Sequence, residues 1–139
     1  MYYRYIFKQM YNDVNEDSIS DMVDTFYGEI RHDPLLGPIF AGAIGDDWGP
    51  HLAKMKAFWS TVLLASRTYK GNPMMAHLQL PRLTASHFAR WLELWRETAA
   101  RLCSSGPAEV FVQKAEMIGA RLLGAISQHH EHFAAQAHS

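Results

Sequence analysis

Residues 17–31 read DSISDMVDTFYGEIR, with apolar side chains spaced three and four residues apart. The apolar positions are Ile19, Met22, Val23, Phe26, Tyr27 and Ile30. A stripe with this period lies on one face of an α-helix, so the segment predicts an amphipathic helix packed on a core. Ser18 followed by Asp21 favours a capped start for this helix. Asp33-Pro34 ends it, because a residue before proline disfavours the helical conformation.

Three further segments have the same helical period. They run from about Asp46 to Ala65, from Thr84 to about Leu102, and from a proline-marked start near Pro107 to Gln128. The Gly49-Pro50 pair must lie in the first turn of its helix or just before it, because an interior proline would break the hydrogen-bond ladder. No segment alternates apolar and polar residues with β-branched side chains. The sequence therefore predicts an all-α fold with four main helices and no sheet.

Two connections between these helices are longer than simple turns. Residues 34–45 are apolar and rich in glycine and proline, so we expect this connection to be packed. Residues 66–83 form a long loop, and long loops in compact domains are usually functional. Within the second loop, Pro73 and Pro81 bracket one or two helical turns that carry His77 among apolar neighbours.

Composition limits the class of protein. The 139 residues suffice for one domain, and their 48% hydrophobic and 19% charged content is that of a globular protein. The formal net charge of -1 argues against a nucleic-acid-binding surface, which needs a basic excess. The single cysteine, Cys103, excludes an internal disulfide framework and any multi-cysteine metal site.

We expect neither a membrane-spanning segment nor a signal peptide at the start of the chain. No stretch is apolar for long enough to span a membrane, and Arg4 and Lys8 interrupt the start where a signal peptide would be apolar. We therefore expect a cytoplasmic protein without membrane or nucleic-acid partners. We divide it into an N-terminal extension over 1–14, one domain over 15–128 and a His-rich tail over 129–139.

Four polar side chains occupy positions that should face the core. Tyr27, His51 and Trp91 lie on the apolar faces of three different helices, and His77 lies in the bracketed loop. A buried polar group needs a hydrogen-bonding partner, and any one of these alone is more often a satisfied core residue. Four such groups from four elements together predict a cavity at the centre of the bundle.

The residue types restrict what such a cavity holds. Zinc needs three or four strong ligands, whereas these faces offer two histidines and no suitable carboxylate or cysteine. Haem needs one strong ligand, commonly histidine, and a large apolar slot, so it fits best. Two alternatives remain open: a cofactor-free helical bundle that serves as a protein-interaction or sensor module, and a zinc protein that uses His51 and His77.

Six short strings carry a resemblance to a known family. They are FY at 26–27, DPLLGPIF at 33–40, WGPH at 48–51, FW at 58–59, AHLQLP at 76–81 and FARWLEL at 88–94. In this order they resemble the truncated haemoglobins, most closely group III, over residues 15–128. The resemblance implies a globin-like, truncated two-over-two helical sandwich that binds haem b.

The resemblance also implies a role for each candidate residue. His77 is expected to be the proximal ligand of the haem iron. The distal residues are expected to be Tyr27, His51 and Trp91. Contacts with the haem are expected from Phe40, Lys54, Met55 and Trp59, with Lys54 at the edge, where it reaches a propionate.

The implied function is the binding of O2 and of other diatomic ligands, NO and CO. Hydroxyl and indole donors around such a ligand would retain it rather than release it readily. The same donors suit NO detoxification, as in a haem-dependent NO dioxygenase, or peroxidase-like chemistry. The sequence leaves open whether the protein is a carrier or an enzyme and whether a reductase serves it.

Overall fold

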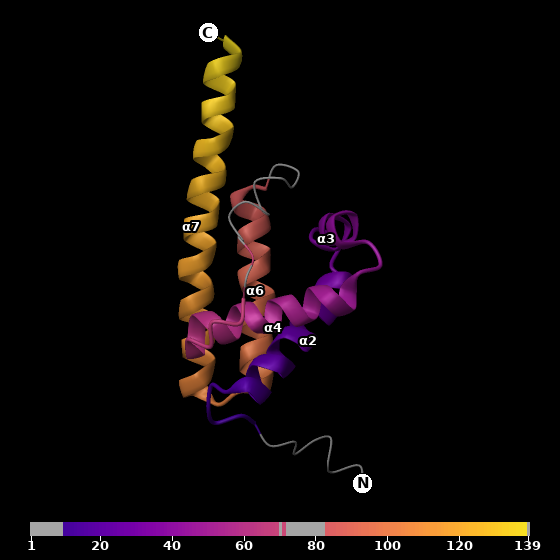
Figure 1. Ribbon diagram of the computed structural model, residues 1–139, viewed down its shortest axis with the longest axis vertical. Coiled ribbons are helices and arrows are strands. Elements are labelled where there is room, and N and C mark those ends of the chain that lie inside the picture. The colour runs from indigo at the N-terminus through magenta and orange to yellow at the C-terminus, as the bar shows by residue number, and fades with distance from the viewer. Residues whose placement is uncertain (1–9, 70, 72–82, 139) are drawn as a thin grey trace.

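The computed structural model of the chain describes residues 10–69, 71 and 83–138, and these contain α-helices but no strand (Figure 1). The helices are α2 (Glu16–Arg31), α3 (Gly37–Ile44), α4 (Trp48–Leu64), α6 (Ala85–Leu102) and α7 (Ser105–His138). The all-α prediction is confirmed.

The helices form two layers. Helix α6 packs along α7, and α2 packs against both α4 and α6, while α3 rests on α2. Figure 1 shows α6 and α7 side by side, with α4 running across them. The pair α2 and α4 therefore lies over the pair α6 and α7, as the predicted two-over-two sandwich requires.

Helix α2 begins earlier than the sequence predicted. The side chain of Asn15 accepts the backbone N–H of Ser18 at 2.9 Å, and the Ser18 hydroxyl accepts the backbone N–H of Asn15 at 2.9 Å. This reciprocal capping box makes Asn15 the cap and Ser18 the third helical residue. The prediction that Ser18 caps the helix with Asp21 was wrong, although the end at Arg31 is confirmed.

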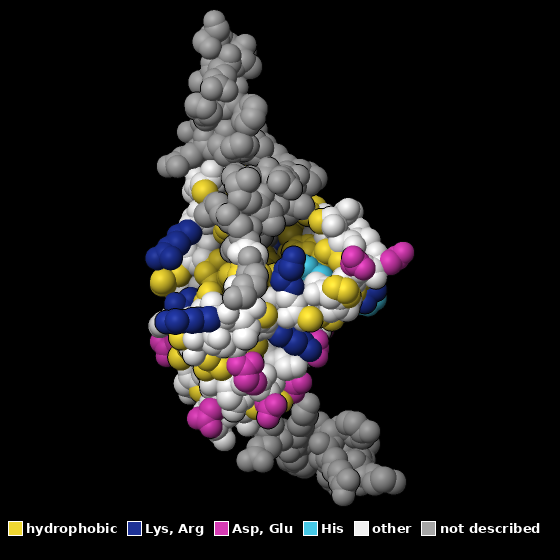
Figure 2. Space-filling model, in the orientation of Figure 1, with side chains coloured by type: hydrophobic (Ala, Val, Ile, Leu, Met, Phe, Trp, Pro, Cys, Tyr) yellow, Lys and Arg dark blue, Asp and Glu magenta, His cyan; other side chains and the backbone are white. Residues whose placement is uncertain are grey.

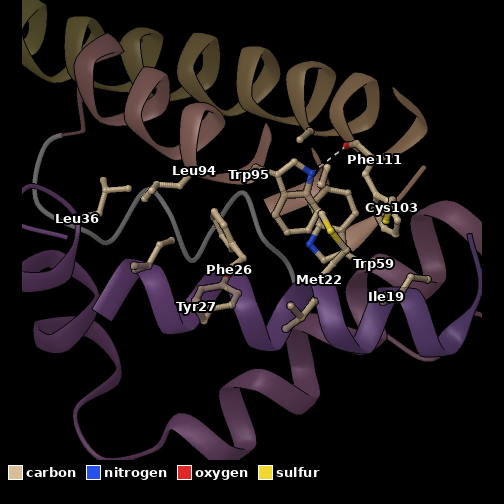
Figure 3. Close-up of a cluster of buried hydrophobic side chains, with 14 residues drawn as sticks. Ile19, Met22, Phe26, Tyr27, Leu36, Trp59, Leu94, Trp95, Cys103 and Phe111 are labelled. Atoms are coloured by element: carbon tan, nitrogen blue, oxygen red, sulfur yellow. Dashed lines mark hydrogen bonds between the residues drawn. The ribbon is translucent and has the colours of Figure 1, made fainter. Parts of the chain in front are cut away.

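The core is centred on Trp95, whose side chain is 0% exposed (Figure 3). Its ring stacks on Trp59 from α4, with centroids 4.6 Å apart and planes 16° apart. Phe26 from α2 meets it edge-on, with centroids 4.8 Å apart. Its indole N–H donates to the carbonyl oxygen of Phe111 on α7 at 3.0 Å. One tryptophan thus joins both layers of the sandwich.

The connection over 34–45 contains a helix that the sequence analysis missed. Helix α3 follows a turn in which the Asp33 carboxylate accepts the backbone N–H groups of Leu35 and Leu36. Only Gly37 of α3 is buried, and a Cβ there would lie 3.2 Å from the carbonyl oxygens of Ile30 and Arg31. The expectation of a packed connection was therefore wrong for most of this helix, which stays partly or fully exposed.

The other boundaries follow local residue chemistry. Pro50 lies in the first turn of α4, as predicted, where its missing N–H costs no helical bond. Helix α7 continues past Gln128 to His138, because Ala, Gln and Glu in the tail sustain a helix and no proline stops it.

None of the helices in the described part of the chain is long and apolar enough to cross a membrane.

Candidate functional site

A cavity of about 520 Å³ lies among α2, α3, α4, α6 and α7. Its volume falls within the range of about 300–1,000 Å³ that is typical of cofactor and small-molecule sites. Figure 2 shows a hollow with hydrophobic side chains inside it and a histidine and a basic side chain at its edge. The lining residues are Tyr27, Leu36, Ile39, Phe40, Ala43, Ile44, His51, Lys54, Met55, Phe58, Trp59, Tyr69, Gly71, Leu83, His87, Phe88, Trp91, Ile118 and Leu122.

Every candidate site residue that the structure describes lines this cavity. They are Tyr27, Phe40, His51, Lys54, Met55, Trp59 and Trp91. The eighth candidate, His77, lies outside the described residues. The structure thus brings three of the four predicted polar groups, Tyr27, His51 and Trp91, to one cavity, and the convergence of His77 with them stays a prediction.

Tyr27 projects from α2 and is only 6% exposed. Its ring meets that of His51 edge-on, with centroids 5.1 Å apart and planes at 88°. On another side it meets Phe40 of α3, with centroids 5.7 Å apart. Burial raises the pKa of the Tyr27 hydroxyl, which therefore keeps its proton and remains a hydrogen-bond donor at neutral pH.

His51 carries the unpaired polar atom of the site. Its Nε2 is buried and has no hydrogen-bond partner among the described residues. Burial lowers the pKa of the imidazole, and the positive charge of Lys54 lowers it further, so the ring is neutral near pH 7. A buried nitrogen without a partner is costly unless a ligand or water completes it. The atom therefore marks where a polar ligand group fits.

Lys54→Met is expected to raise the pKa of His51, because it removes the positive charge that disfavours the imidazolium. The pKa should stay below its ordinary value, since burial is the larger cause. A pH titration of the His51 ring signals by NMR measures this shift. Lys56→Met is the matched control, because Lys56 pairs with Asp24 at 3.0 Å. Equal His51 titrations in wild type and Lys54→Met would contradict the expectation.

Trp91 reaches the cavity from α6 and is partly buried. Its ring lies parallel to that of Trp95, with centroids 6.5 Å apart, and meets Phe26 edge-on at 6.0 Å. These contacts fix the plane of the indole. No described residue accepts its N–H, which can only donate and is free to bind a ligand in the cavity.

The sequence analysis missed several lining residues. Phe58 and Phe88 lie within the family strings, and Ile118 and Leu122 belong to the apolar period of α7, so the signal was present but was assigned to the core. His87, which was not among the candidate site residues, also lines the cavity. Its Nδ1 accepts the N–H of Thr84 at 2.9 Å, which caps α6 and holds the ring in place.

The side chains of the described residues do not form a metal-binding cluster of their own. Within residues 10–69, 71 and 83–138, no group of three or more His, Cys, Asp or Glu side chains lies close enough to hold a metal ion. The zinc alternative combines His51 with His77, and His77 lies outside those residues. A cofactor that brings its own metal suits an apolar cavity in which the buried Nε2 of His51 has no partner among the described residues.

Two curated proteins are similar to the chain in sequence, although no family model matches it. The group 3 truncated haemoglobin ctb of Campylobacter jejuni is 37% identical over 108 residues, which is 76% of this chain and 85% of that protein. The group 2 truncated haemoglobin YjbI of Bacillus subtilis is 28% identical over 111 residues, which is 76% of this chain and 80% of that protein.

Two solved structures share the fold. The group III truncated haemoglobin of Campylobacter jejuni matches with a TM-score of 0.81 and 33% identity, over 85% of this chain and 95% of that chain. A thermostable haemoglobin of Thermobifida fusca matches with a TM-score of 0.68 and 22% identity, over 79% and 91%, and supports the fold alone. The chain therefore belongs to the truncated haemoglobin family and is most like its group III members.

Proposed function

We propose that the cavity binds haem b and that the protein binds O2 and other diatomic ligands, NO and CO, at that haem. Family membership implies haem-based ligand binding in general terms. The observation that carries the proposal is the buried Nε2 of His51, which has no partner in the described part of the chain and belongs to a ring beside Tyr27 in a largely apolar cavity.

The apolar walls suit a large flat group. Phe40 from α3 and Met55 and Trp59 from α4 present apolar surface to the cavity. Lys54 is exposed at the same cavity, where its ammonium would meet a propionate. His77 is the proposed proximal ligand by its match to the family string. When bound, haem supplies an iron with a position for a diatomic ligand.

Three polar groups would meet that ligand. The Tyr27 hydroxyl and the Trp91 indole N–H are neutral donors, and the neutral His51 ring donates or accepts according to its tautomer. Donors in a site that excludes water bind a partly negative ligand more strongly than in water. We therefore propose that the pocket retains O2. We also propose that the protein uses it in NO detoxification or peroxide reduction, with a reductase as the electron donor.

The visible absorption spectrum of the purified protein, before and after addition of haem, tests the proposal. An intense Soret band that shifts when CO is added is the expected result. His77→Ala should weaken the band or change its position, whereas His32→Ala, which replaces an exposed histidine, should not.

A protein that stays colourless after haem is added would overturn the proposal. It would favour the cofactor-free bundle instead. Zinc found by elemental analysis in such a colourless protein would favour the zinc alternative.

A further inference from the structure

We propose that Asp33 and Arg90 are positioning residues that hold helix α3 against the cavity and thereby keep Tyr27 oriented toward the ligand. The inference rests on the proposed function, because it concerns how the ligand is retained. Neither residue lines the cavity. Their effect on the ligand would pass through α3.

Asp33 is a buried carboxylate with partners on both oxygens. One oxygen accepts the N–H groups of Leu36 at 2.9 Å and Leu35 at 3.2 Å, which closes the turn before α3. The other oxygen accepts Nε of Arg90 at 2.8 Å. The Asp33 side chain is 2% exposed, and Arg90 Nη1 also donates to Glu93 at 2.8 Å. Asp33 is buried and Arg90 is 34% exposed, so removing Arg90 would leave the buried carboxylate without its charged partner.

The state of the carboxyl agrees with this geometry. Burial raises the pKa of Asp33, but the N–H of Leu36, the Arg90 guanidinium and the N–H of Leu35 together outweigh it. The net result is a pKa below the ordinary value. The carboxylate is therefore charged at neutral pH, and its ion pair with Arg90 is maintained.

Helix α3 has few other attachments. Only Gly37 of α3 is buried, where the backbone of α3 meets the end of α2, and the other side chains of the helix are partly or fully exposed. Among the described residues, the Asp33–Arg90 contact is the one side-chain hydrogen bond that ties the segment 32–47 to another helix. Breaking it would remove the hydrogen bond that links the turn before α3 to helix α6, so the distance between α3 and α6 would be less constrained.

The position of α3 matters to the ligand through Phe40. Phe40 is carried by α3 and packs edge-on against the Tyr27 ring. Tyr27 in turn packs against His51. A shift of α3 therefore moves one of the rings that hold the Tyr27 hydroxyl in place, while Trp91 keeps its own contacts with Trp95 and Phe26.

The test compares Arg90→Met with wild type in two measurements. In the haem-loaded protein, Arg90→Met should release O2 about three- to tenfold faster, which lies within the range usual for a residue that acts on a site without touching it. Hydrogen exchange of the backbone amides of α3 should also be faster, with α6 and α7 unchanged. Arg90→Lys should give release and exchange rates between those of wild type and Arg90→Met, because lysine keeps the positive charge but lacks the planar guanidinium group.

The chain offers a matched control on the same helix. Arg96 pairs with Glu116 at 2.8 Å, and both side chains are about half-exposed at 54% and 46%. Arg96→Met removes the same charge, together with a hydrogen bond to an acidic side chain, at a place away from α3. It should leave both the O2 release rate and the exchange of α3 unchanged.

A second variant keeps the inference testable if Arg90→Met does not fold. Asp33→Asn removes the charge but retains one oxygen for the turn, and it should speed exchange in α3 and O2 release in the same direction. Exchange and release within about a factor of two of wild type in the folded variants would overturn the inference. A wild-type protein that takes up no haem would refute the proposed function. Hydrogen exchange can be measured without haem, so it would still show whether Asp33 and Arg90 hold helix α3 in place.

Discussion

Tyr27→Phe is expected to speed release of O2 from the haem-loaded protein by about 10- to 100-fold. The substitution removes a hydroxyl whose hydrogen bond to a partly negative ligand contributes about 1.5–3 kcal/mol, or about one to two decades in rate. It keeps the ring, so the edge-on contacts with Phe40 and His51 remain. Stopped-flow displacement of O2 measures the rate directly.

Trp91→Phe tests the second hydrogen-bond donor of the pocket in the same way. The variant loses the indole N–H, and its release rate should rise by a similar factor. If the two donors act independently, the double variant should be faster by about two to four decades. CO is less polar than O2 and should respond less to either change.

The control for these variants is Tyr11→Phe. The Tyr11 hydroxyl donates to Asp21, and Tyr11 does not line the cavity. Its removal should leave O2 release unchanged. Tyr27→Phe and Trp91→Phe release rates that stay within about a factor of two of wild type would show that hydrogen bonding does not retain the ligand. Delivery of O2 would then fit the pocket better than retention.

Periodicity predicted the long helices because their sequence alone specifies which face is buried. Helix α2 shows this: its apolar stripe over 17–31 identifies the face that enters the core, and Tyr27 on that face reaches the cavity. The start of the helix was missed because Asn15 lies before the stripe and Ser18 fits either role in a capping box.

Helix α3 could not be predicted by the same reasoning. Its sequence GPIFAGAI is apolar on every side, so no amphipathic period distinguishes a helix from a packed loop. Two tertiary contacts position α3: Gly37 lies close to the end of α2, and Arg90 binds Asp33 in the turn before the helix. Both depend on residues far from α3 or on backbone contact, which a local pattern does not contain.

The candidate site was predicted in part because polar groups stood out on apolar faces. Tyr27, His51 and Trp91 were found in this way, and the structure brings them to one cavity. Phe40, Lys54, Met55 and Trp59 came from the family resemblance. The sequence did not predict His87 as a lining residue, because a single histidine at the start of a helix is usually at the surface. Its place in the lining depends on how α6 packs.

Trp95→Ala is expected to lower the free energy of unfolding by about 3–5 kcal/mol, the usual cost of removing a fully buried large aromatic side chain. Trp95 is 0% exposed, so its loss leaves a cavity at the centre of the sandwich. The carbonyl oxygen of Phe111 would also lose the indole N–H that donates to it. Urea unfolding followed by circular dichroism measures the change.

Two further variants separate the causes of this loss. Trp95→Phe keeps most of the ring volume but not the N–H, so it should cost clearly less than Trp95→Ala. Val110→Ala changes a side chain that is 45% exposed on α7 and should have little effect. A loss below about 1 kcal/mol for Trp95→Ala would mean that the core repacks around the gap.

The cost of Trp95→Ala should extend to the cavity. Trp59 and Trp91 both line the cavity, and both stack on Trp95 from opposite layers of the sandwich. Without Trp95 these two rings lose the surface that fixes their planes, so the haem-loaded variant should also lose haem faster to an excess of an acceptor protein. A variant that is destabilised but retains haem as tightly as wild type would show that the two cavity walls are held independently of the core.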